Sequence, residues 1–143
     1  MLENLVYIKY MDMIQQSDAV IAISTVKTHR ILYIDFCING VDDIESCWST
    51  QKAREIADVF YRIIGLQSND KVLKEEVKQD ISPLKDHEWQ SYLSITREKE
   101  HFILFVDSIE LGFSKTFETG MDNETIKIAA DAIVAAIDKV ESL

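Results

Sequence analysis

The segment from Arg30 to Ile38 alternates between two sets of side chains, and this alternation constrains the fold more than any other feature of the sequence. Successive side chains of a β-strand point to opposite faces. One face of this strand would carry Leu32, Ile34, Phe36 and Ile38, and the other Ile31, Tyr33, Asp35 and Cys37. The preceding segment, Ala19–Val26, is rich in β-branched residues, and Lys27-Thr28-His29 joins the two as a polar turn. We therefore predict a β-hairpin whose first face belongs to the core.

Several shorter segments predict further strands. Asn39-Gly40 is a turn signal, and a short strand is expected after it at 44–48. A second hairpin is predicted from 89–96 and 101–107, followed by a strand at 109–117 with Gly112 as a bulge or bend. The first residues, 2–14, place apolar side chains on one face of a helix, but Tyr7, Ile8 and Tyr10 also permit a strand.

Two amphipathic helices are predicted. The first begins at a cap formed by Ser49 or Thr50 and ends at Gly65, which we expect to adopt a left-handed conformation. The last begins at Asp122 or Asn123 and continues close to the C-terminus. Between the two helices, 66–86 reads as a polar surface connection with a short helix at Lys71–Lys78.

These elements predict one α+β domain over residues 1–143. Its antiparallel sheet would be built from two hairpin or meander units, with helices packed on one face. Strands precede a helix in both halves, yet no aligned residues mark a sequence repeat.

The charge balance bears on the partners of the chain. Fifteen basic and 25 acidic residues give a formal net charge of -10. Most basic residues stand beside acidic ones, whereas binding to a phosphate backbone relies on clustered Lys and Arg. We expect no direct binding to nucleic acid or anionic membrane, and we favour a basic protein as the partner.

The sequence contains no recognisable catalytic or cofactor motif. Its four glycines stand far apart and form no phosphate loop, so we expect no nucleotide cofactor. His87-Glu88 and Glu100-His101 could meet across the second hairpin, but charges at strand ends are more often solvated, and we predict no metal site. Cys37 and Cys47 are expected to be buried thiols. No signal peptide or long apolar run is present, and a cytoplasmic location is expected.

Two acidic groups beside predicted turns are the candidate partner-binding residues. Each would offer carboxylates, together with an aromatic side chain of the kind that anchors interfaces. The candidates are Asp42, Asp43, Glu45 and Trp48 in the first group, and Asp107, Glu110, Phe113 and Glu118 in the second.

These features favour a non-enzymatic binding protein. Small size, acidity and missing catalytic motifs suit an immunity protein that neutralises a basic, nuclease-like bacterial toxin, although no motif of such a family is present. A small acidic chaperone of type III-like secretion, which binds an extended effector segment, is the alternative. An enzyme or small-ligand domain with a site assembled from scattered residues also stays open, as does the oligomeric state.

Overall fold

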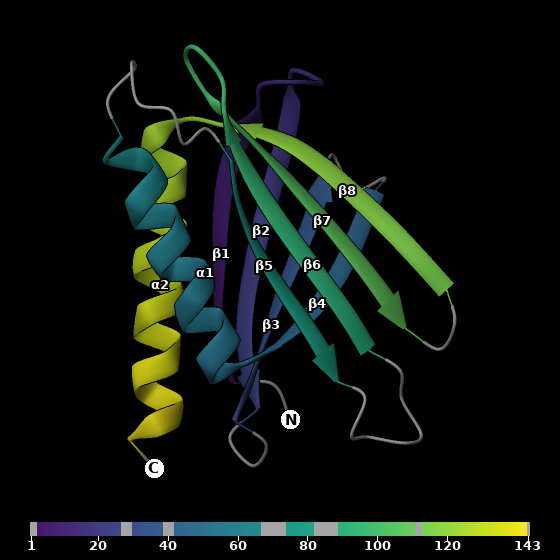
Figure 1. The fold of residues 1–143 in the computed structure, drawn as a ribbon, viewed down its shortest axis with the longest axis vertical. Coiled ribbons are helices and arrows are strands. Elements are labelled where there is room, and N and C mark those ends of the chain that lie inside the picture. Colours follow the sequence, from purple (N-terminus) through teal and green to yellow (C-terminus); the bar gives the residue numbers. More distant parts are fainter. Residues whose placement is uncertain are drawn as a thin grey trace.

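Each half of the chain folds into four strands followed by one helix (Figure 1). The computed structural model describes residues 3–26, 30–38, 42–66, 74–81, 89–110 and 113–142. The first half comprises β1 (Glu3–Asp12), β2 (Ser17–Val26), β3 (Ile31–Ile38), β4 (Asp42–Ser49) and α1 (Thr50–Ile64). The second comprises β5 (Lys74–Ile81), β6 (Trp89–Arg97), β7 (Phe102–Glu110), β8 (Phe113–Met121) and α2 (Asn123–Glu141).

The strands form two antiparallel sheets, which confirms the α+β prediction. The first sheet has the order β1-β2-β3-β4 and the second β5-β6-β7-β8, so every strand pairs with its neighbour in the chain. Figure 1 shows the second sheet in front of the first and the two helices side by side along one side of the molecule. Helix α1 contacts strands of both sheets, and α2 packs on β1 and β2.

The alternation predicted for the third strand is confirmed residue by residue. Along β3, half-buried and buried side chains alternate without interruption, and the buried set begins at Leu32. In the second sheet, Leu93 and Ile95 of β6 and Leu104 and Val106 of β7 are likewise buried. Each sheet therefore has an inner face that belongs to the core and an outer face that does not.

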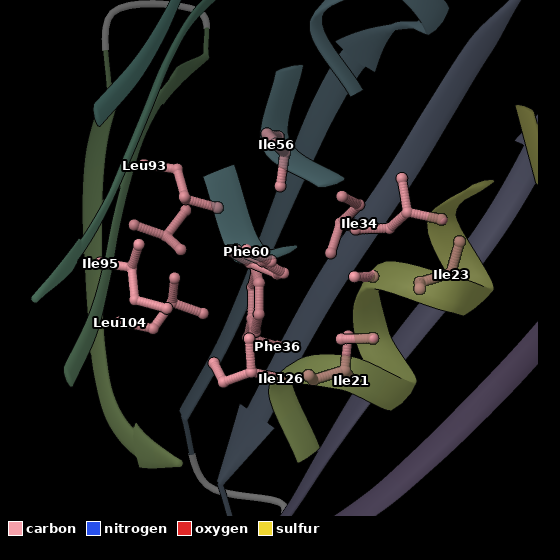
Figure 2. Packing of buried hydrophobic residues seen from close by; sticks show 14 of the residues in the cluster. Ile21, Ile23, Ile34, Phe36, Ile56, Phe60, Leu93, Ile95, Leu104 and Ile126 are labelled. Atoms are coloured by element: carbon pink, nitrogen blue, oxygen red, sulfur yellow. The ribbon is translucent and has the colours of Figure 1, made fainter. Parts of the chain in front are cut away.

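The inner faces and the helices share one hydrophobic core. Figure 2 shows Leu93, Ile95 and Leu104 on one side of this core and Ile21, Ile23 and Ile34 on the other, with Phe36 between them. The ring of Phe36 stacks on that of Phe117 with centroids 5.3 Å apart, which joins the two sheets directly. Burial of such apolar surface is the main favourable contribution to folding.

The helix starts agree with the predicted caps. Ser49 Oγ accepts a hydrogen bond from the backbone N–H of Lys52 at 3.1 Å, and Asp122 Oδ1 accepts one from Thr125 at 2.8 Å. The predicted left-handed stop at Gly65 is wrong, because its φ is -81° and ψ is -9°. The last turn of α1 instead ends in right-handed geometry, with the Gly65 N–H donating to the carbonyl of Tyr61.

Two further predictions need correction. Residues 3–12 form strand β1, in which Ile8, Tyr10 and Asp12 are buried; this is the strand that Tyr7, Ile8 and Tyr10 permitted. The short helix at Lys71–Lys78 is wrong for its described part, because β5 begins at Lys74. This strand is charged because only alternate residues, such as Val77 and Gln79, face inward.

Other boundaries shift or lie outside the described residues. The strand expected at 109–117 is β8, which spans Phe113–Met121, while Ile109 still belongs to β7. The predicted turns at Lys27-Thr28-His29 and Asn39-Gly40, the bend at Gly112 and the pair His87-Glu88 lie outside the part that the structure describes. No helix among the described residues is long and apolar enough to cross a membrane.

Candidate functional site

The outer face of the second sheet carries the candidate site. Because Val77, Leu93, Val106 and Phe117 are buried on the inner face, the residues next to them along each strand point outward. Cross-strand pairing aligns these outward residues in rows. One row consists of Lys78, Tyr92, Asp107 and Thr116.

A groove with a volume of about 510 Å³ lies on this face. We call it the outer groove. Its described lining combines aromatic, apolar and charged side chains: Lys78, Gln79, Ser91, Tyr92, Phe105, Asp107 and Ile109. A concave surface with apolar walls and a few polar groups is the usual form of a binding site.

Two aromatic rings and a cation form one wall of the outer groove. The rings of Tyr92 and Phe105 meet edge to face, with centroids 6.1 Å apart and an interplanar angle of 64°. Lys78 Nζ lies 5.7 Å from the centroid of the Tyr92 ring, within the range of a cation–π contact. The groove thus already contains a cation on an aromatic face.

Acidic side chains border the same rings. Asp107 is half-buried beside Tyr92 in the neighbouring strand, and its Oδ1 accepts a hydrogen bond from Ser114 Oγ at 3.2 Å. Glu118 is exposed on β8, directly across from Phe105. Asp107 and Glu118, both from the second predicted acidic group, therefore lie on the same outer face of the second sheet.

The buried part of the groove lining is bonded to the other sheet. The Gln79 side-chain amide accepts a hydrogen bond from the backbone N–H of Ser49 at 2.7 Å and donates one to the carbonyl of Cys47 at 3.0 Å. Ser91 Oγ donates to the same Cys47 carbonyl at 3.2 Å. These bonds pair the edge of β4 with side chains of the second sheet, so they fix the base of the groove relative to the first sheet.

The remaining predicted residues lie elsewhere. Trp48 is fully buried in the core, where its Nε1 donates to Ser46 Oγ at 2.9 Å, so its predicted role as a surface anchor is wrong. Glu45 is exposed on β4, in the first sheet, on the face opposite to the buried Ile44 and Ser46. The structure does not unite the two predicted groups on one face.

For four predicted residues, only the position in the backbone is described. Asp42 and Asp43 open β4, opposite Ile38 and Cys37 of β3. Glu110 and Phe113 pair with each other at the end of β7 and the start of β8. Their side chains lie outside the described part of the structure.

Sequence reasoning missed Lys78, Tyr92, Phe105 and Ile109. A signal for two of them was present in the alternation, because Tyr92 precedes the apolar Leu93 and Phe105 lies between the apolar Leu104 and Val106. Alternation therefore places both rings on the outer face. Lys78 was assigned to a helix, and nothing in the sequence indicated that its strand would lie beside Tyr92.

The described residues hold no group of three or more His, Cys, Asp or Glu side chains arranged to bind a metal ion. Cys47 is buried as predicted, whereas Cys37 is only half-buried. The chemistry that the outer groove offers is contact with aromatic rings, one ammonium group and carboxylates.

Comparison with known proteins extends the description of the fold. No family model and no curated protein sequence matches this chain. Among solved structures, the chain is similar to the plant transcriptional regulator PBF-2, with a TM-score of 0.56 and 8% sequence identity over 96% of this chain and 84% of that one. At this identity the likeness shows a shared fold and carries no residue of the site.

Proposed function

We propose that this protein is a non-enzymatic binding module that holds a basic protein on the outer face of its second sheet. Its function would be that of a cytoplasmic bacterial inhibitor, an immunity protein that neutralises a nuclease-like toxin. The observation that carries the proposal is the placement of Asp107 and Glu118 beside the rings of Tyr92 and Phe105, on a sheet face where no described helix packs.

This arrangement suits cationic side chains. An arginine or lysine entering the outer groove would meet carboxylates together with aromatic faces, and both attract cations. Lys78 over the ring of Tyr92 is an internal example of the same contact. Arginine is the better candidate, because its planar guanidinium can stack on a ring and bond a carboxylate at the same time.

The charge of the whole chain supports the same class of partner. A net charge of -10 attracts a basic protein before contact and raises the association rate, more strongly at low salt. The active site of a nuclease is basic because it holds phosphate. An acidic surface can therefore cover it in place of the substrate.

The test is co-expression with the protein encoded by the adjacent gene, followed by measurement of the mass, affinity and nuclease activity of the purified complex. We expect one partner per chain, loss of nuclease activity, and an affinity that falls as salt rises. Substitution Phe105→Ala should weaken the complex, because it removes one of the two aromatic rings of the groove.

Three results would overturn the proposal. The first is the absence of any complex with a folded basic protein. The second is binding of an extended effector segment in place of a folded protein, which would favour the secretion chaperone. The third is direct binding of single-stranded or duplex DNA, which the likeness to a transcriptional regulator makes worth measuring in parallel.

A further inference from the structure

Strand β1 and the turn after it expose most of the large apolar side chains found on the surface. Eight such side chains are exposed among the described residues, and six of them belong to this segment. We call these six the β1 patch: Leu5, Val6, Tyr7, Met11, Met13 and Ile14. By alternation Leu5, Tyr7 and Met11 share the outward face of β1, and apolar side chains exposed together mark an interaction site more often than isolated ones do.

The position of β1 adds backbone hydrogen-bonding groups to the apolar side chains of the patch. Strand β1 lies at the edge of the first sheet and pairs with β2 on one side. The other side of an edge strand offers backbone N–H and C=O groups to another strand. A partner can therefore add both hydrogen bonds and apolar contacts here.

The other three edge strands are protected from such pairing. The side chains of Gln79 and Ser91 bond the edge of β4. Strand β5 packs against α1 and exposes Lys74, Glu76 and Lys78, while β8 exposes Lys115 and Glu118. Charges of this kind keep sheet edges from joining.

Strand β1 carries fewer such charges, although α2 packs on it and the turn after it bonds β8 through the Met13 N–H. From residue 5 to residue 14 the sequence contains two charged residues, Lys9 and Asp12. Asp12 is fully buried and is occupied by hydrogen bonds from the backbone N–H groups of Ile14, Gln15 and Gly120. Lys9 alone is left as an exposed charge within this stretch.

The charge pattern indicates what covers the patch. Between residues 5 and 14 a basic partner would find no exposed carboxylate, and on the paired strand Asp18 lies across from Met11. A second copy of this acidic chain is repelled by most of the surface, but not by this near-neutral strand. A second copy also supplies a matching surface, namely another edge strand with exposed apolar side chains.

We propose that two copies of the protein associate through antiparallel pairing of their β1 strands about a two-fold axis. The pairing would join two first sheets into one continuous sheet and bring together the outward side chains Tyr7, Lys9 and Met11 of both copies. A standard interface takes roughly a tenth of the surface of a small protein. The surface here is 8462 Å², so an interface of this kind would bury roughly 850 Å² of each copy.

The experiment is sedimentation equilibrium of the full chain over a range of concentrations, with Tyr7→Lys and Met11→Lys as variants. The wild type should dimerise, and each variant should raise the dimer dissociation constant by at least about tenfold. Added lysine lowers the net negative charge, so general repulsion between copies would fall. A weaker dimer would therefore report loss of the contact itself.

Ile128→Lys is the matched control, because Ile128 is 45% exposed on α2, outside the patch, and the charge change is the same. Hydrogen exchange should show that β1 amides are protected in the dimer and lose protection on dilution. A monomer at all concentrations would overturn the inference, as would a dimer that Ile128→Lys weakens and Tyr7→Lys does not. Phe105→Ala should leave the dimer intact, so this result and the test of partner binding are independent.

Discussion

The side-chain amide of Gln79 bonds the backbone of Cys47 as a neighbouring strand would, with its Nε2 donating to the Cys47 carbonyl at 3.0 Å. Its Oε1 accepts a hydrogen bond from the backbone N–H of Ser49, two residues further along β4. One side chain of the second sheet thus satisfies a donor and an acceptor on the edge of the first. Since Gln79 also lines the outer groove, this contact links the stability of the fold to the shape of the site.

Substitution Gln79→Leu should destabilise the protein by about 1–3 kcal/mol, because the half-buried N–H of Ser49 loses its acceptor. The Cys47 carbonyl would keep its bond from Ser91. Urea unfolding measures the effect. Lys78→Gln, one residue earlier and exposed, is the control and should change stability by less than about 0.5 kcal/mol; an equal loss in both variants would contradict this role for Gln79.

Two glycines should respond to alanine in opposite directions. A Cβ at Gly120 would lie 2.9 Å from the Cβ of Met13 and 3.2 Å from the backbone N of Ile14, so Gly120→Ala should cost about 1–3 kcal/mol. At Gly65 the nearest atom would be 3.5 Å away and φ is already -81°. Gly65→Ala should therefore leave the stability unchanged or raise it by about 0.4–1 kcal/mol.

Thermal unfolding of the two variants checks this pair. A clear loss of stability in Gly65→Ala would contradict the right-handed end of α1. A neutral Gly120→Ala would contradict the close packing of the β1–β2 turn on β8, where Met13 N–H also donates to the Gly120 carbonyl at 3.0 Å.

Tyr61 should titrate at unusually high pH. Its hydroxyl donates a hydrogen bond to Asp131 on α2, and this bond raises the pKa of Tyr61 from 10.0 to about 12. The neutral hydroxyl is the form that the fold favours. Its stabilising contribution is therefore complete below pH 10 and is lost as the pH rises toward 12.

Ultraviolet absorbance at alkaline pH follows this titration, and the difference between the wild type and Tyr61→Phe isolates it. Asp131→Asn removes the carboxylate and should return the pKa of Tyr61 toward its ordinary value. If the curve of Asp131→Asn coincided with that of the wild type, the bond would not be the cause.

The sequence predicted those elements in which local pattern and burial agree. The alternation from Leu32 to Ile38 reproduces the burial of β3, and the oxygens of Ser49 and Asp122 cap the helices as expected. Strand β5 was missed because its stability comes from pairing with β6 and not from its own residues, which are mostly charged. The division into two sheets was missed because it depends on contacts such as Phe36 with Phe117, far apart in the sequence.

The candidate site was predicted in part for a similar reason. The acidic residues Asp107 and Glu118 were identified from turns and charge, and both do lie on an open face. Trp48 was misplaced because an aromatic residue beside acidic ones can serve an interface or the core, and here its ring faces the core beside Ser46. The outer groove itself arises from cross-strand rows, whose register the sequence alone does not determine.

Calorimetric titration of the basic partner with two charge-matched double variants tests the role of the outer face most directly. Asp107→Asn/Glu118→Gln removes two carboxylates from that face, and Asp58→Asn/Asp138→Asn removes two exposed carboxylates from the helices. The first double variant should weaken binding by at least about tenfold, and the second by less than about twofold. Equal losses in both would show that net charge alone attracts the partner, and no loss in the first would show that the partner binds elsewhere.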